Sequence, residues 1–184
     1  MDDLIISLFY EIDNFCKEFI LYMEQQCIQS NNNPVSLGLP SCLSLSEVMA
    51  ICVAFHLSGY RTFKWFYQKL ILKDYRKFFP DLVSCSRFVE LMPYTALPMT
   101  FFAYSRNGKC TGISFVDSTT IDVCDSHRIQ QHKVFKDIAR RGKSSTGWFY
   151  GFKLHLAIND RGEILDFCLT AGNTDDRNPG QTHE

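Results

Sequence analysis

The sequence has no run of apolar residues long enough to span a membrane, and it does not open with a basic segment followed by an apolar stretch. It has eight cysteines but no Cys-x-x-Cys pair and no spacing typical of metal-ligating cysteines. Most cysteines lie among apolar residues, so we interpret them as reduced core thiols of a cytoplasmic protein. They occupy positions 16, 27, 42, 52, 85, 110, 124 and 168.

The chain also has little net charge, −1 overall, but its charges are unevenly distributed. Residues 1–60 carry seven acids and one base, residues 61–109 nine bases and three acids, and residues 110–184 nine bases and ten acids. A basic middle segment favours a polyanion such as DNA as a partner, although a solvated basic surface explains it equally well. Apolar residues make up 46% of the 184 residues, enough for a core within one or two domains.

Helical periodicity dominates the first half of the chain. Apolar residues recur at intervals of three and four over residues 3–29, which predicts a helix followed by a loop through Pro40. A second helix is predicted to begin at Ser44, whose hydroxyl and the Glu47 carboxylate form the pattern of a capping box.

An aromatic and basic segment follows over residues 62–79, and Ser84 is predicted to cap a short helix after the break at Pro80. The aromatic side chains are interpreted as core rather than as a stacking surface for bases. Two short helices with basic side chains resemble a helix-turn-helix, although any small helical bundle has the same pattern.

The pattern changes to strands in the second half. Strands are predicted over residues 112–123, 148–158 and 163–170, with a turn at Asn159–Gly162. Between the first two strands, residues 126–147 are polar and basic and are predicted to be a loop, of a length that is usually functional or disordered.

Asp117 follows the apolar run Ile113–Val116 and precedes three hydroxyl residues. A carboxylate at the end of a buried strand would lie at the edge of the core and face an open, polar cleft, where it could meet a metal or a substrate. The alternative is that Asp117 caps a turn, because Asp, Ser and Thr all favour turns.

Three segments in order resemble DDE transposases of bacterial insertion sequences, and in particular the IS982 family within the broader IS4/IS5-like set. They are Phe115–Thr119, Gly151–Leu156 and Leu169–Asp176, with the basic stretch between the first and the second. The resemblance covers nearly the whole chain, including its helical first half.

This resemblance implies an α+β chain. A helical, DNA-binding region over 1–109 would precede the opening three-stranded antiparallel part of an RNase H-like catalytic domain over 110–184. It implies that Asp117 is the first catalytic, metal-binding aspartate and that the complete enzyme uses Mg²⁺ or Mn²⁺. The implied partners are the inverted-repeat ends of the element and its target DNA.

The family's second aspartate and its glutamate lie in later segments that have no counterpart here. Several carboxylates must converge to hold two metal ions. We therefore expect an N-terminal fragment that does not cleave DNA alone, and we interpret Asp175 and Asp176 as part of a structural turn after the third strand. The apolar faces of Phe152, Leu154, Phe167 and Leu169 would stay partly uncovered and invite association with a second copy.

Two other functions remain open from the residues. One is a DNA-binding module that competes with or regulates a full-length transposase, and the other is an unrelated metal nuclease that uses Asp117, Asp122 and Asp175. For DNA binding we predict the basic side chains of both halves: Lys64, Lys69, Lys73, Arg76, Lys77, Arg87, Arg128, Lys133, Lys136, Arg140, Arg141, Lys143 and Lys153.

Overall fold

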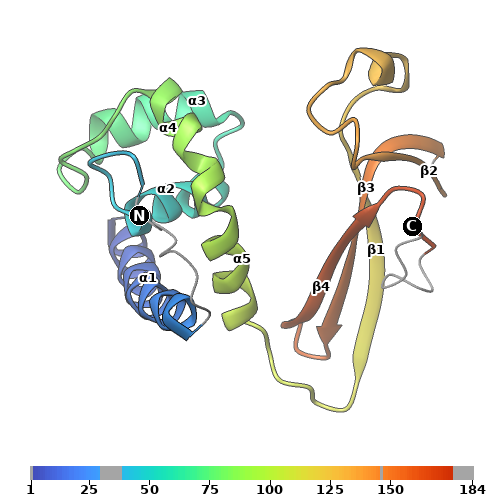
Figure 1. Cartoon of the computed structure of the whole chain (residues 1–184), viewed down its shortest axis with the longest axis horizontal. Helices are drawn as coiled ribbons and strands as arrows, with labels where there is room; N and C mark the ends of the chain where they lie inside the picture. Colours follow the sequence, from blue (N-terminus) through green and yellow to red (C-terminus); the bar gives the residue numbers. More distant parts are fainter. Residues whose placement is uncertain (1, 30–38, 146, 176–184) are drawn as a thin grey trace. The chain divides into compact units, whose positions relative to one another are not determined.

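The computed structural model describes residues 2–29, 39–145 and 147–175. The chain forms two compact units, Met1–Ser105 and Arg106–Glu184 (Figure 1). The described residues of the first unit form helices, whereas those of the second form an antiparallel sheet and a short 3-10 helix. The predicted α+β class is therefore confirmed.

Two helices open the first unit. α1 spans Asp2–Gln29 and α2 spans Leu45–Leu57, as the periodicity predicts. The side chains of Ile12, Cys16 and Met49 are almost completely buried where α1 and α2 meet. Most of the predicted loop between the helices, residues 30–38, lies outside the described part of the chain.

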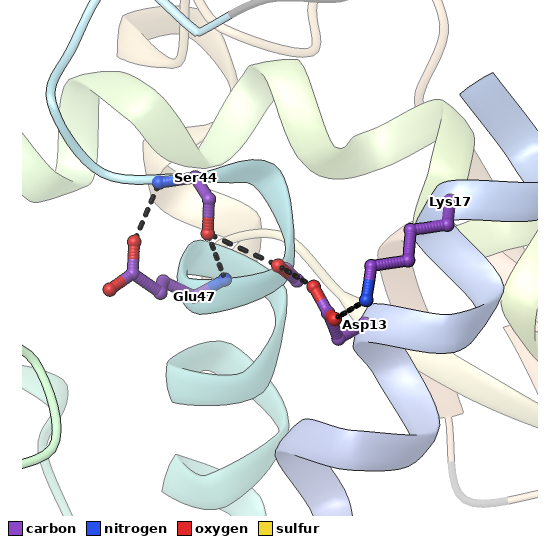
Figure 2. Close-up of polar contacts among 5 residues, drawn as sticks. Asp13, Lys17, Ser44 and Glu47 are labelled. Carbon is purple, nitrogen blue, oxygen red and sulfur yellow. Dashed lines mark hydrogen bonds and ion pairs between the residues drawn. The ribbon is translucent and has the colours of Figure 1, made fainter.

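The capping box at the start of α2 forms as predicted and is linked to α1 (Figure 2). The Glu47 amide donates to Ser44 Oγ at 3.2 Å, and the Ser44 amide donates to Glu47 Oε2 at 2.7 Å. Ser46 Oγ then donates to Asp13 Oδ1 at 2.8 Å, while Lys17 Nζ lies 2.7 Å from Asp13 Oδ2. The hydrogen bond from Lys17, aided by the one from Ser46, holds the pKa of Asp13 below its ordinary value.

The aromatic segment forms the main core of the first unit. α3 (Phe63–Phe66) continues into the π-helical η1 (Tyr67–Asp74), and Ser84 caps α4 (Cys85–Leu91) as predicted. Phe66, Tyr67 and Phe88 are fully buried, and the Tyr67 and Phe88 ring centroids are 4.9 Å apart. The interpretation of the aromatic residues as core is confirmed, with the exception of Trp65, which is 57% exposed.

A last helix, not predicted, closes the first unit. The 3-10 helix η2 (Met92–Thr95) leads into α5 (Ala96–Ser105). Pro98 lies in the first turn of α5, where a missing amide hydrogen costs no intrahelical bond. Phe101 and Phe102 anchor the helix against α1, with ring centroids 5.3 Å and 5.1 Å from those of Phe19 and Phe15.

The second unit is built around one long strand (Figure 1). β3 (Gly147–Asn159) pairs antiparallel with β1 (Ser114–Asp122), β2 (Arg140–Ser144) and β4 (Ile164–Ala171). This four-stranded sheet is consistent with the opening part of an RNase H-like domain. The three predicted strands are present.

The fourth strand corrects the prediction of a loop over residues 126–147. This stretch contains the 3-10 helix η3 (Ser126–Gln131) and β2 (Arg140–Ser144). Its basic composition gave no strand signal, but β2 pairs only with β3 among the described strands. Charged side chains are common on such edge strands because they discourage pairing with other chains.

The turn between β3 and β4 forms where predicted, and Asn159 organises it. The Asn159 side chain is 1% exposed, and its Oδ1 accepts hydrogen bonds from the amides of Arg161 and Glu163 at 3.0 Å and 2.9 Å. Its Nδ2 donates to Lys109 O at 3.1 Å and to Glu163 Oε2 at 2.6 Å. Gly162 has a φ of 80°, a conformation that favours glycine.

The cysteines are only partly as predicted. Seven of them are free thiols in the described part of the chain, and Cys16 is buried. Burial raises the pKa of the Cys16 thiol to about 11. Cys42, Cys110 and Cys168 are exposed, so they are not core thiols.

Candidate functional site

Asp117 lies in the interior of β1, opposite Leu156 of β3, and not at the end of a strand. The expectation that Asp117 lies at a strand end is therefore wrong, whereas the predicted strand over 112–123, which contains Asp117, is present as β1. Residues 118–120 are hydroxyl residues, two of them β-branched threonines, and β3 offers them paired backbone groups as far as Asp122. Pairing with β3 thus extends the strand through residues that would otherwise favour a turn.

The Asp117 carboxylate is exposed, and its Oδ1 accepts a hydrogen bond from the Ser118 amide at 2.8 Å. Within the described residues it neither caps a helix nor forms an ion pair. Its neighbours across the sheet are Leu156 and, one strand further, Phe167. Paired residues of an antiparallel sheet share a face. The surroundings on the sheet are therefore apolar, and the expected polar cleft is not formed by these strands.

The acids proposed for a metal nuclease do not converge. Asp117 and Asp122 are five residues apart on one strand, so their side chains point to opposite faces of the sheet. The described residues contain no group of three or more His, Cys, Asp or Glu side chains that could hold a metal ion. Asp117 alone is therefore one ligand and not a metal site, and the structure does not support the nuclease hypothesis.

The segment after β4 has a structural role, consistent with the interpretation of Asp175 as part of a turn. The Gly172 amide donates to Gly151 O at 3.0 Å, and a Cβ on Gly172 would lie 2.6 Å from Arg140 O. The Thr174 amide donates to Ala171 O at 3.0 Å, which closes the turn. Asp176 lies outside the described residues.

Lys153 is buried, which argues against the prediction that it contacts DNA. Its side chain is 8% exposed, and Nζ donates to Thr174 O at 2.9 Å. Its neighbour on the same face, His155, is 5% exposed and lies 2.9 Å from Thr170 Oγ1 through Nε2. Lys153 therefore ties the turn after β4 to the sheet, and its ammonium is not placed to meet a phosphate.

The predicted basic residues of the first unit are on its surface, but three already have intramolecular contacts. Lys69 Nζ lies 4.8 Å from the Trp65 ring centroid, and Lys77 Nζ lies 3.2 Å from Asp2 Oδ2. The half-buried Arg87 donates to Glu90 Oε2 and to Pro40 O, both at 2.7 Å. The exposed members of the set are Lys64, Lys69, Lys73, Arg76 and Lys77.

The helix-turn-helix resemblance is not supported. The helical segment that ends at Asp74 and the helix that begins at Cys85 are joined by residues 75–84. A helix-turn-helix joins its helices with a turn of about 3–4 residues. Arg87, the one base on α4, is engaged by Glu90 and Pro40.

In the second unit, six predicted DNA-binding residues are exposed on an ordered surface. Phe135 contacts Phe152 of β3 edge-on at 5.7 Å, and Tyr150 Oη donates to Lys136 O at 3.5 Å. These contacts hold the stretch between η3 and β2 against the sheet. The exposed bases are Arg128, Lys133, Lys136, Arg140, Arg141 and Lys143.

Trp148 is a surface residue to which the sequence analysis gave no role. It is 63% exposed, and the Arg141 guanidinium carbon and Lys143 Nζ lie 5.8 Å and 5.9 Å from its ring centroid. A tryptophan at the start of a strand, five residues after a lysine, could have indicated an exposed ring beside a cation. The signal is ambiguous, because the same pattern fits a buried ring equally well. An open hollow lies beside it, lined by Asp122, Val123, Cys124, Asp125, Ser126, Arg128, Trp148 and Phe149.

A comparison with known families found a match in the second unit. Residues 107–183 match the family model described as Transposase DDE domain. The match begins just before β1 and includes Asp117 and all four strands. It supports a DDE transposase, a class that acts on DNA and depends on divalent metal ions. No curated protein and no solved structure matches the chain.

No helix in the described part of the chain has the length and apolar character needed to cross a membrane.

Proposed function

We propose that the chain is an insertion-sequence transposase of the IS982 family that works in the cytoplasm. It would bind the inverted-repeat ends of its element and take part in their cleavage and in strand transfer to target DNA. The observation that carries the proposal is the match of residues 107–183 to a transposase DDE domain, with the carboxylate of Asp117 exposed on the first strand.

Asp117 is proposed as the first metal-binding acid of that site. Two-metal phosphoryl transfer needs several carboxylates around one substrate phosphate. The described residues place no other metal-binding side chains around Asp117 to complete a metal site. We propose that the remaining ligands for Mg²⁺ or Mn²⁺ come from beyond the described residues.

The exposed bases are proposed to bind the DNA backbone. Cations that neutralise phosphates release counterions, so the affinity falls steeply with salt. Their role is supported by the fact that, within the described residues, none of six exposed bases of the second unit forms an ion pair: Arg128, Lys133, Lys136, Arg140, Arg141 and Lys143. The exposed apolar side chains Phe115, Val116 and Leu169 favour self-association of the second unit.

Asp117→Asn tests the catalytic assignment. In a plasmid excision assay with the intact element, this variant should lose at least about 100-fold in excision, because the amide removes the charge that a cation needs. Asp166→Asn is a matched control: Asp166 is also an exposed strand carboxylate, and its Oδ1 also accepts from the next amide at 2.8 Å. Full excision by Asp117→Asn would overturn the assignment.

A second candidate function is a DNA-binding regulator that competes with an active transposase. It is favoured by the six exposed bases of the second unit. It is also favoured because the described residues bring no further acids to Asp117 to complete a metal site. In that case residues 1–184 would bind element ends without cleaving them, and their expression would lower excision by the active enzyme. Cleavage by residues 1–184 alone would exclude this candidate.

A further inference from the structure

We propose that Trp148, flanked by Arg141 and Lys143, is a stacking site for one unpaired base of a DNA strand. The inference rests on the proposed function, since it takes DNA as the ligand. It adds a specific contact, one nucleobase on one indole ring, to the general attraction between exposed bases and phosphates.

The β2–β3 hairpin places these three side chains on one face. Lys143 pairs directly with Trp148, and Arg141 pairs with Tyr150, the next residue but one along β3. Paired residues share a face of an antiparallel sheet, and so do residues two apart on one strand. Both cations lie within 6 Å of the indole centroid, while 63% of the Trp148 surface stays exposed.

No carboxylate of the described residues neutralises the charges of Arg141 and Lys143. Within the described residues, neither Arg141 nor Lys143 forms a salt bridge with a carboxylate. Two cations beside an exposed aromatic ring suit a single DNA strand, because its phosphates need positive charge and its bases need a stacking partner. In an intact duplex the bases are stacked on one another and cannot lie on a protein ring.

The hollow beside Trp148 adds polar groups that suit the edge of a base. Asp122 and Asp125 line it with acceptors, and Arg128 lines it with donors. A base stacked on the indole would have both kinds of group nearby. The mixed charge of the hollow favours a neutral base there, with the phosphates towards Arg141 and Lys143.

Trp65 provides a control within the same chain. It is 57% exposed, and the cation beside it is Lys69, four residues further along the same helical segment, with Nζ 4.8 Å from the ring centroid. Pairs at this spacing are ordinary neighbours on a helix surface. Since the sequence has two tryptophans, Trp65→Phe leaves Trp148 as the only indole, and Trp148→Phe leaves Trp65.

Fluorescence of these two single-tryptophan proteins tests the contact. The ligand is an oligothymidine of about ten nucleotides, within the length that single-strand-binding domains cover. We expect saturable quenching of Trp148 in the Trp65→Phe protein and little quenching of Trp65 in the Trp148→Phe protein. Equal quenching of both, or quenching of neither, would overturn the proposal.

Affinity measurements separate this inference from the proposed function. Trp148→Ala should weaken oligothymidine binding about tenfold and change binding of a duplex of equal length less than about twofold. Trp148→Phe should retain most of the affinity because it keeps a ring, and thermal melting should show that both variants are folded. Arg141→Ala and Lys143→Ala should weaken binding of both DNAs.

The failures are distinguishable. If Trp148→Ala binds oligothymidine as the wild type does while duplex binding stays salt-dependent, the stacking site is wrong and the proposed function stands. If Trp148→Ala loses duplex and single-strand binding equally, Trp148 is not a base-specific contact. If the wild type binds neither DNA at low salt, both proposals fail.

Discussion

The helical unit holds most of the buried apolar side chains of the described residues, whereas the sheet unit buries few. Phe66, Tyr67 and Phe88 of the first unit are fully buried. In the second unit, Val116 is 71% exposed and Leu169 is 55% exposed. The first unit therefore gains stability mainly from apolar burial, at about 25 cal/mol per Å² removed from water.

The interior of the sheet unit depends more on polar contacts. Lys153, His155, Asn159 and Thr170 are all at most 9% exposed, and all four have hydrogen-bond partners in the described residues. No buried side-chain nitrogen or oxygen of the described residues lacks a partner. Removing one member of such a set leaves its partner unsatisfied. The two units are thus sensitive to different kinds of substitution.

The largest effect is expected for Phe88→Ala in the first unit. The substitution removes a fully buried ring that packs against Tyr67 and Phe63, with centroids at 4.9 Å and 5.5 Å. We expect a loss of about 3–5 kcal/mol in the free energy of unfolding. Urea unfolding followed by far-ultraviolet circular dichroism, which reports the helices, measures it.

Phe115→Ala is the matched control in the second unit. Phe115 is 58% exposed on β1, so in the monomer the same substitution should cost within about 0.5 kcal/mol. A loss as large as that of Phe88→Ala would mean that the apolar face of the sheet is covered in solution. The contrast between the two units would then be wrong.

A smaller effect, confined to the sheet unit, is expected for Asn159→Ala. The variant loses the acceptor for two amides and the donor to Lys109 O and Glu163 Oε2. Leaving buried groups of the turn unsatisfied should cost about 1–3 kcal/mol. Unfolding followed by the fluorescence of Trp148, in the Trp65→Phe background, reports this unit.

Asn173→Ala serves as the control for Asn159→Ala. Asn173 is an exposed residue of the turn after β4, and its truncation should change stability by less than about 0.5 kcal/mol. Equal losses for the two variants would show that the buried hydrogen bonds of Asn159 do not set the stability of this unit.

The smallest effect concerns pH and the ion pair of the helical unit. Lys17 and Ser46 lower the pKa of Asp13 from 3.8, so the pair stabilises the fold above that pH and loses its contribution as the pH falls through the lowered value. Because Lys17 is largely exposed, the contribution is at most about 1 kcal/mol. Asp13→Asn should therefore be less stable than the wild type at neutral pH, and the difference should shrink in acid.

Lys17→Met provides the second half of that test. It removes the main cause of the lowered pKa, so it should flatten the same part of the stability–pH curve. A difference between wild type and Asp13→Asn that persists unchanged in strong acid would show that Asp13 acts through packing and not through its charge.

Several features were predictable because they depend on a few neighbouring residues. The capping box joins Ser44 to Glu47, and the cap of α4 joins Ser84 to Arg87, each across three residues. The turn at residues 159–162 depends on glycine and asparagine in one short segment. Helical and alternating patterns likewise placed α1 and α2 and three of the four strands.

The features for which the prediction was wrong depend on partners distant in the chain. Arg140–Ser144 is a strand because β3 offers it an edge, although its own composition is that of a polar loop. Lys153 is buried because Thr174, twenty-one residues later, accepts its hydrogen bond. Neither partner can be inferred from the local pattern of charge.

For the residues of functional interest, too, some properties follow from the sequence and others only from the tertiary structure. The sequence alone determined that Asp117 lies in the first of three segments that resemble a DDE transposase and that residues 126–147 are basic, because both are properties of order and composition. Only the tertiary structure paired Asp117 with Leu156 of β3 and so gave its carboxylate apolar neighbours on the sheet. Only the hairpin register brought Arg141 and Lys143 beside Trp148, since pairing decides which side chains share a face.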